Sequence, residues 1–298
     1  MCSMRGTLSW AAGGLRTMPE LGDKYRQARG RLAGLGRAVV AFSGGVDSTL
    51  LAVMAREVLG RANVLAVTAD SPSLAREDLA EAVRLARQLE LSHEVIATHE
   101  TADPAYRRNT PARCYICKHE LFEELEDLAT ARGFHAILYG AIGDDLRAER
   151  PGQRAALAFG VLAPLQDAGL TKREVRQLAK TLGLPNWDRP QNACLASRIP
   201  HGMDVTEEKL RQIEQAEAML REAGFRQVRV RHLGRHARIE VEPEELSRFH
   251  DVALRARITE RVETLGFETV GIDRAGYQTG GADRVLADEV LLSSLCKC

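Results

Sequence analysis

The stretch that most constrains this chain is VVAFSGGVDSTLLA, Val39 to Ala52. It joins a row of apolar residues, typical of a buried strand, to a serine-glycine loop with an aspartate, and then to an apolar run with helical spacing. A strand, a glycine-rich turn and a helix place backbone N–H groups at one edge of a sheet, where anions such as phosphate bind. Neither the Walker pattern nor the dinucleotide fingerprint is present in this stretch. The loop therefore predicts a phosphate site of another kind.

Short apolar strands alternate with helical patterns over the first two thirds of the chain. This alternation predicts an α/β fold, a doubly wound parallel sheet covered on both faces. A helix beginning after Thr171, with Glu174 as its capping-box partner and Gly183 at its end, is expected to close this first domain. The predicted strands are AVVAF, VLAVTA, HEVIAT and HAILYGA.

The pattern changes after the proline-rich stretch PNWDRPQNACLASRIPHGMD. The order that follows predicts a smaller α+β domain. Its expected elements are a helix over 206–222, strands over 227–232 and 235–241, a helix over 244–265 and a strand over 268–272. We therefore divide the chain into an N-terminal segment, 1–18, a first domain, 19–200, a second domain, 201–280, and a C-terminal tail, 281–298.

Composition narrows the functional class. The 41 basic residues balance 41 acidic ones, so the net charge gives no sign of a strong nucleic-acid or membrane binder. No apolar run is long enough to span a bilayer. Six cysteines, two of them spaced as Cys114-x-x-Cys117, indicate metal or redox chemistry in a reducing compartment. We expect a cytoplasmic protein.

The residues SGGVDS resemble the pyrophosphate loop of the ATP pyrophosphatase superfamily, whose fold is the adenine nucleotide alpha-hydrolase type. The resemblance implies that ATP binds at the sheet edge and is cleaved between its α- and β-phosphates. It also implies that Asp47 acts in catalysis near a Mg²⁺ ion and that the end of the second strand, from Thr68, lies by the adenosine. The implied phosphate-binding residues are Ser43, Gly44, Gly45, Asp47 and Ser48.

Three further stretches resemble the LarE family of sulfur transferases: ARCYICKHELF, YGAIGDDLRAERPG and NACLASRIPHG. The resemblance covers roughly residues 20 to 280. It implies that the carboxylates of a pyridinium dicarboxylate mononucleotide are adenylated and then converted to thiocarboxylates, on the way to the nickel-pincer nucleotide cofactor. In the sacrificial version, Cys194 attacks the acyl-adenylate and gives up its sulfur, which leaves dehydroalanine. A thiolate suits this attack, and we expect Arg198 to lower the thiol pKa.

The cysteine pair departs from the purely sacrificial pattern. Some relatives hold a [4Fe-4S] cluster with three cysteines, and the resemblance implies that Cys114, Cys117 and Cys194 are its ligands here. Thiolates are the ligands that such clusters prefer, and this cluster is our leading expectation for the sulfur source. Two alternatives stay open. In the first, Cys194 is sacrificial and the Cys114–Cys117 pair binds no metal; in the second, the cysteines bind zinc or no metal at all. Cys2, Cys296 and Cys298 fit no pattern.

The second domain carries candidate substrate-binding residues. The period of two in RQVRVRH places Arg229 and Arg231 together on one strand face, where paired guanidiniums suit a phosphate. Glu217 falls within the apolar stripe of its helix, so it needs a partner, either an arginine of the next strand or a ligand. We assign these three residues, with Arg198, to substrate binding. Asp144 and Asp145 follow a strand and are further candidates.

The sequence thus predicts an enzyme that uses ATP, Mg²⁺ and a [4Fe-4S] cluster to act on a small nucleotide substrate, as a homo-oligomer. A tRNA thiolation enzyme of the same superfamily is the nearest alternative, although the neutral charge and the absence of paired zinc-finger cysteines stand against it. A module that senses ATP or AMP without chemistry is an alternative of another class, and the intact loop and the three cysteines disfavour it.

Overall fold

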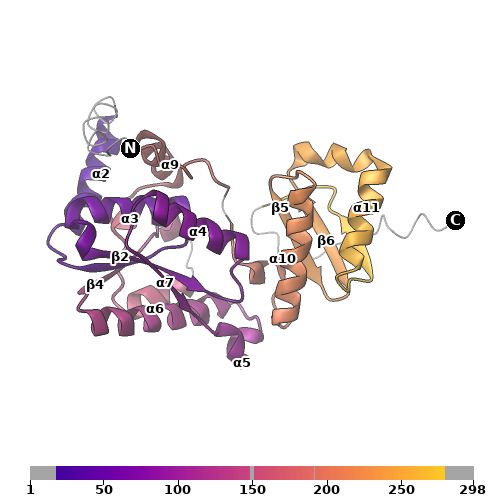
Figure 1. Cartoon of the computed structure of the whole chain (residues 1–298), viewed down its shortest axis with the longest axis horizontal. Helices are drawn as coiled ribbons and strands as arrows, with labels where there is room; N and C mark the ends of the chain where they lie inside the picture. Colours follow the sequence, from indigo (N-terminus) through magenta and orange to yellow (C-terminus); the bar gives the residue numbers. More distant parts are fainter. Residues whose placement is uncertain (1–17, 148–150, 191, 279–298) are drawn as a thin grey trace. The chain divides into compact units, whose positions relative to one another are not determined.

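The computed structural model describes residues 18–147, 151–190 and 192–278 (Figure 1). Residues 1–17 of the predicted N-terminal segment, the predicted tail at 281–298, and with them Cys2, Cys296 and Cys298, lie outside this description. The chain forms two compact units. Unit 1 comprises residues 1–100 and 114–192, and unit 2 comprises residues 101–113 and 193–298.

Unit 1 contains a four-stranded sheet in which every pair of neighbours is parallel. Its strands are β1 (Ala38–Ala41), β2 (Val64–Asp70), β3 (His93–Ala97) and β4 (Ala136–Tyr139), in the order β3-β2-β1-β4. The chain adds β2 and β3 on one side of β1 and then crosses to add β4 on the other. This reversal places the carboxyl end of β1 at a topological switch point, where α/β proteins bind ligands.

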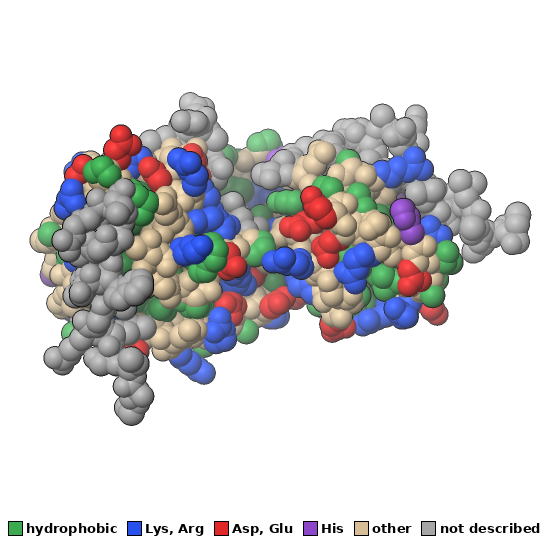
Figure 2. Space-filling view, turned by 90° about the horizontal axis from the view of Figure 1, so that it is seen from above, with side chains coloured by type: hydrophobic (Ala, Val, Ile, Leu, Met, Phe, Trp, Pro, Cys, Tyr) green, Lys and Arg blue, Asp and Glu red, His purple; other side chains and the backbone are tan. Residues whose placement is uncertain are grey.

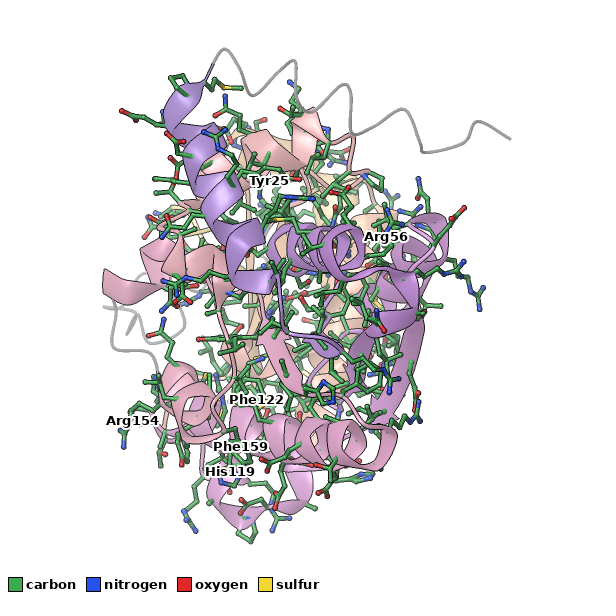
Figure 3. The ribbon with its side chains drawn as sticks, turned by 90° about the vertical axis from the view of Figure 1, so that its left-hand side faces the viewer. Tyr25, Arg56, His119, Phe122, Arg154 and Phe159 are labelled. Carbon is green, nitrogen blue, oxygen red and sulfur yellow. The ribbon has the colours of Figure 1, made fainter. Side chains whose placement is uncertain are left out.

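Helices cover both faces of this sheet, as the buried apolar strands require. One apolar cluster contains Leu50 and Met54 beneath the helices of one face, and a second contains Val39 and Phe122 on the other. Figure 3 shows Tyr25 and Arg56 on helices of the first face and Phe122 on the opposite side of the sheet. The α/β class is confirmed. The helices are α2 (Pro19–Leu32), α3 (Val46–Leu59), α4 (Arg76–Gln88), α6 (Arg113–Arg132), α7 (Pro151–Ala158), α8 (Pro164–Asp167) and α9 (Lys172–Thr181), with 3₁₀ turns η2 (Arg61–Asn63) and η4 (Gly143–Arg147).

The capping box expected at α9 is present. The Thr171 side chain accepts a hydrogen bond from the Glu174 backbone N–H, and the Glu174 carboxylate accepts one from the Thr171 N–H at 2.8 Å. Two of the N–H groups that a helix leaves unpaired at its start are thereby satisfied. The cap fixes Lys172 as the first residue of α9, which matters for the site described below.

In unit 2, helices α10 (Glu207–Glu222) and α11 (Val252–Glu263) pack on a three-stranded sheet. The unit also contains α5 (Pro104–Arg107) and the 3₁₀ turns η3 (Glu100–Ala102), η5 (Leu195–Arg198) and η6 (Pro243–His250). Strands β5 (Val228–Leu233) and β6 (His236–Val241) are antiparallel, and β7 (Thr269–Ile272) runs parallel to β6. Leu220, Val230, Ile239 and Val262 belong to its apolar core.

The predicted helix over 244–265 is wrong as a single element. The structure has the turn η6, a break at Asp251, and then α11. The Asp251 carboxylate accepts hydrogen bonds from the N–H groups of Ala253 and Leu254, so it caps a new helix start. An aspartate in this capping geometry favours a fresh N-terminus over a continuous helix.

The predicted limits of the two functional domains, 19–200 and 201–280, stay a prediction. The compact units differ from them in one clear respect, because residues 101–113 belong to unit 2. Two backbone hydrogen bonds illustrate why: the N–H of Gly202 donates to Asn109, and that of Val205 donates to Arg107.

The visible surface carries both charges. Figure 2 shows basic and acidic side chains interspersed on the face that it presents. Many of these charges are paired, for example Arg189 with Asp78 and Arg84 with Glu81, both at 2.7 Å. Within the described ranges, no helix has the length and apolar content needed to cross a membrane.

Candidate functional site

The loop from Ser43 to Ser48 joins β1 to α3 at the carboxyl edge of the unit 1 sheet. Gly44 has a φ of 70°, a left-handed conformation that glycine adopts without strain. A Cβ at this position would lie 2.9 Å from the Cα of Ala82, so the backbone of α4 occupies the space that a side chain would need. Gly45, which has no capping side chain, precedes α3 and leaves the N–H groups of its first turn for a ligand. This cradle fits phosphate groups.

Two serines hold the loop in shape. The Ser43 N–H donates to the Ser48 hydroxyl at 3.2 Å, and that hydroxyl donates to the Gly45 carbonyl at 3.1 Å. Ser48 is buried, whereas the Ser43 side chain is exposed. The five predicted phosphate-binding residues therefore lie together on one loop and its helix start.

Asp47, in the first turn of α3, is paired with Lys172. The lysine Nζ lies 2.9 and 2.7 Å from the two carboxylate oxygens. Burial raises the pKa of Asp47, and Lys172 opposes that rise, so the ion pair favours the carboxylate form. Lys172 was not among the residues predicted from the sequence. Its position as the first residue after the capping box was the one available signal.

The loop after β4 joins this site. A Cβ on Gly140 would lie 2.8 Å from the Ser48 nitrogen, so the end of β4 packs directly on the first turn of α3. Asp144 accepts a hydrogen bond from the backbone N–H of Lys172 at 2.6 Å, and the charge of Asp145 also raises the pKa of Asp47. The two aspartates singled out in the sequence thus lie around the Asp47–Lys172 pair.

Thr68 is buried at the end of β2. Its hydroxyl donates to the Phe42 carbonyl at 2.6 Å and lies 2.8 Å from His93 Nε2. Because the single hydroxyl proton goes to Phe42, His93 donates to Thr68. Thr68 thus fixes the backbone of Phe42, which directly precedes the phosphate loop. The predicted position of Thr68 beside the adenosine stays a prediction.

The three cysteines of the predicted cluster divide between the units. Cys114 and Cys117 lie at the start of α6, where a spacing of three puts them on one helix face, and Cys114 is exposed. Cys194 is exposed in unit 2 and directly precedes η5. Inside each unit, the described residues contain no group of three or more histidine, cysteine or acidic side chains that could hold a metal. The predicted cluster is therefore not supported.

Unit 2 buries an ionic cluster beneath η5 and along β5 and β6. Arg198 is almost fully buried and makes two hydrogen bonds to Glu217, from Nε at 2.8 Å and from Nη2 at 3.0 Å. Arg198 also donates to the Cys194 carbonyl at 2.8 Å, so it fixes the backbone that carries the exposed thiol. The buried members of this ionic cluster are Arg198, Glu217, Arg229, Arg231, Arg238, Glu240 and Asp273.

Glu217 does lie in the apolar stripe of α10, as the sequence predicts, and it is fully buried. Its ion-pair partners include Arg198 of η5 and Arg221 of its own helix, the latter at 3.1 Å, and its charge also acts on Arg229 of the next strand. It also accepts a hydrogen bond from the Val230 N–H at 3.1 Å, which satisfies the outer edge of β5. The carboxylate thus joins helix, turn and strand.

Arg229 and Arg231 share one face of β5, as predicted, and that face is buried. Arg231 pairs with Glu240 at 2.8 Å and donates to the Ser197 carbonyl at 3.0 Å. Burial, with Arg198 nearby, lowers the pKa of Arg229 to about 10, so the group stays charged at neutral pH but at an energetic cost. The buried members of the ionic cluster are thus four guanidiniums and three carboxylates.

Comparison with known proteins places the chain among nucleotide-using enzymes. A family model described as NAD synthase matches residues 28–122, which include the phosphate loop. The chain is 36% identical to pyridinium-3,5-bisthiocarboxylic acid mononucleotide synthase of Lactiplantibacillus plantarum over 86% of this chain and 92% of the relative. An uncharacterized protein of Synechocystis sp. is 45% identical over 89% of the chain and 99% of its own length. Argininosuccinate synthase of Natronomonas pharaonis is 30% identical over 50% of the chain and 40% of the relative.

Proposed function

The chain belongs to the family of pyridinium-3,5-bisthiocarboxylic acid mononucleotide synthase, the LarE family, and from this membership we propose its substrate, its sulfur chemistry and the residues that perform them. It is an ATP-dependent enzyme with a pyrophosphate loop. The substrate we propose is pyridinium-3,5-biscarboxylic acid mononucleotide, whose carboxylates become thiocarboxylates on the way to the nickel-pincer nucleotide.

We assign the adenylation step to unit 1. A carboxylate oxygen of the substrate attacks the α-phosphorus of ATP, the bond to the β-phosphate oxygen breaks, and pyrophosphate leaves. The backbone N–H groups of the Ser43–Ser48 loop hold the departing phosphates. On ATP binding, Lys172 would turn from Asp47 to a phosphate oxygen, and the Asp47 carboxylate would then be free to hold Mg²⁺. The ion would supply positive charge that neutralises the phosphates.

We assign sulfur transfer to Cys194. Its thiolate attacks the acyl carbon, AMP leaves, and a thioester joins substrate and protein. A base then removes the α-proton of Cys194, the Cβ–Sγ bond breaks with its electron pair on sulfur, and the thiocarboxylate departs. Dehydroalanine remains at position 194. The exposure of the Cys194 side chain supports this role.

A second sulfur source follows from the cysteine pair. The thiols of Cys114 and Cys117 suit iron, and with Cys194 they would supply three ligands to a [4Fe-4S] cluster. Such a cluster would supply a sulfide for transfer and spare the sulfur of Cys194. Because Cys114 and Cys117 belong to one unit and Cys194 to the other, the choice between the two sulfur sources is left to the experiment below.

One observation carries the substrate proposal. The exposed thiol of Cys194 and the buried guanidiniums of Arg229 and Arg231 belong to the same compact unit, and Arg198 links the cysteine backbone to that ionic cluster. A phosphate on the substrate would be bound by these guanidiniums, while the carboxylate would reach the thiol. We also propose a cytoplasmic homo-oligomer that needs neither nucleic acid nor membrane.

The proposal is tested with full-length protein, ATP, Mg²⁺ and the dicarboxylate nucleotide. We expect Cys194→Ala to release pyrophosphate yet form no thiocarboxylate, and wild-type protein to lose the mass of hydrogen sulfide. Cys114→Ala is the matched control, and on the sacrificial route it transfers sulfur like wild type. Iron in the wild type, lost together with transfer in Cys114→Ala, selects the cluster route. Sulfur transfer by Cys194→Ala would overturn both routes.

Pyrophosphate release also separates the competing functions. If ATP binds but no pyrophosphate appears with the dicarboxylate nucleotide, the protein is a sensor or acts on another acceptor. Release that depends on tRNA in place of the small nucleotide would identify a tRNA thiolation enzyme.

A further inference from the structure

Asn186 lies in the segment after α9 and reaches the phosphate loop. It is buried, and its Nδ2 donates to the Gly44 carbonyl at 2.9 Å and to Thr49 Oγ1 at 3.0 Å. None of the reaction steps proposed above uses Asn186. Both N–H groups of this buried amide donate hydrogen bonds, one to the phosphate loop and one to α3, so the side chain has a specific geometric role.

The orientation of this amide is fixed by its partners. Turning it over would place Oδ1 against the carbonyl oxygen of Gly44, and two acceptors at that separation repel each other. In the present orientation Oδ1 is buried and has no hydrogen-bond partner in the described part of the chain. The hydrogen bond from Nδ2 to Gly44 therefore forms although Oδ1 of the same amide has no hydrogen-bond partner among the described residues.

This bond sets the direction of one peptide unit. In a planar trans peptide, the N–H of Gly45 points opposite to the C=O of Gly44. The carbonyl faces the buried Asn186, so the N–H faces the other side, where it donates to the hydroxyl of the exposed Ser43 at 3.4 Å. The Gly45 N–H is thus turned toward the open side of the loop.

Within the loop, a long hydrogen bond from the Gly45 N–H to the Ser43 hydroxyl, at 3.4 Å, restrains this direction only weakly. A flip of the Gly44–Gly45 peptide rotates ψ of Gly44 and φ of Gly45 by about half a turn, and glycine accepts both results because it has no Cβ. Gly45 now has a φ of −72°, which a flip would make positive. The flipped peptide would point a carbonyl oxygen at the phosphates, where a donor is required.

We propose that Asn186 is a positioning residue that locks the Gly44–Gly45 peptide with its N–H toward the pyrophosphate part of ATP. This rests on the proposed ATP site. Asn186 touches neither substrate nor reacting atoms, and it acts through the orientation of one backbone donor.

The test is binding of magnesium pyrophosphate and ATP to full-length variants by titration calorimetry. Asn186→Ala should weaken pyrophosphate and ATP binding about five- to tenfold, as expected for one oriented donor, and leave adenosine binding unchanged. Asn186→Leu keeps the approximate shape and adds no charge but cannot donate, so it should bind pyrophosphate no better than the alanine variant. If Asn186 only fills space, the leucine variant will bind like wild type. Thermal unfolding of each variant identifies any loss of fold.

Gly45→Ala provides a second, independent arm. Alanine accepts the present φ of −72° but resists the positive φ of the flipped peptide, and its Cβ would lie 3.3 Å from the flexible Ser43 side chain. In this background Asn186→Ala should cost much less pyrophosphate affinity than it does with Gly45. Equal losses in both backgrounds, or equal losses for adenosine and pyrophosphate, would overturn the inference. Wild-type protein that binds neither ATP nor pyrophosphate would overturn the proposed function as well.

Discussion

Replacing Glu217 with glutamine tests how unit 2 is held together. The substitution keeps the side-chain volume but removes the charge that faces Arg198 at 2.8 Å and Arg221 at 3.1 Å. Because Glu217 and Arg198 are both buried, breaking their pair costs roughly 3–5 kcal/mol of unfolding free energy. Glutamine still accepts one hydrogen bond, so we expect about 3 kcal/mol. For a domain of this size that lowers the Tm by roughly 10 °C.

Glu222→Gln is the matched control on the same helix. Its side chain is 65% exposed and lies 3.1 Å from Arg261, and an exposed pair contributes less than about 1 kcal/mol. Trp187, the tryptophan among the described residues, belongs to unit 1, so its fluorescence would miss the effect. Calorimetry of the full chain, with hydrogen exchange of α10 and β5, reports on unit 2. Equal destabilisation by the two variants would refute this account of the buried pair.

Three further predictions concern the two sites. Lys172→Ala removes the cation that opposes the raised pKa of Asp47, so we expect the pKa of Asp47 to rise further. In the pH profile of kcat/KM for pyrophosphate release, the acid limb should therefore move to higher pH. An acid limb that does not move would exclude the Asp47–Lys172 pair from catalysis. Gly44→Ala combines left-handed strain with a backbone contact at 2.9 Å and should abolish measurable ATP binding, whereas Gly34→Ala, with similar strain but open space around it, should leave ATP affinity near wild type. Inorganic phosphate should raise the Tm of unit 2 by relieving the buried positive charge at Arg229. Arg229→Ala should lose this shift, whereas Gly44→Ala, which disables the loop of unit 1, should keep it; an unchanged shift in Arg229→Ala would place the phosphate elsewhere.

The local features of the fold were predictable because they depend on residues close in sequence. Apolar runs gave the four parallel strands, and Thr171 with Glu174 gave the start of α9. A strand, two glycines and a helix were enough to predict an anion-binding loop before any contact was known. The break at Asp251 was missed because the apolar pattern continues through it, while the capping bonds that favour a new start are visible only in three dimensions.

The composition of the sites was decided by tertiary structure. Asp47 meets Lys172, and Gly44 meets Asn186, only because the sheet brings the segment around α9 back to the loop after β1. Periodicity placed Arg229 and Arg231 on one strand face, but it could not predict whether that face is exposed or buried. The tertiary structure buries it, and Arg231 donates a hydrogen bond to the Ser197 carbonyl of η5 there. Sequence by itself determines which face of an element a residue occupies. Which distant group it meets there, and therefore its charge balance and chemistry, follows from packing between segments far apart in the chain.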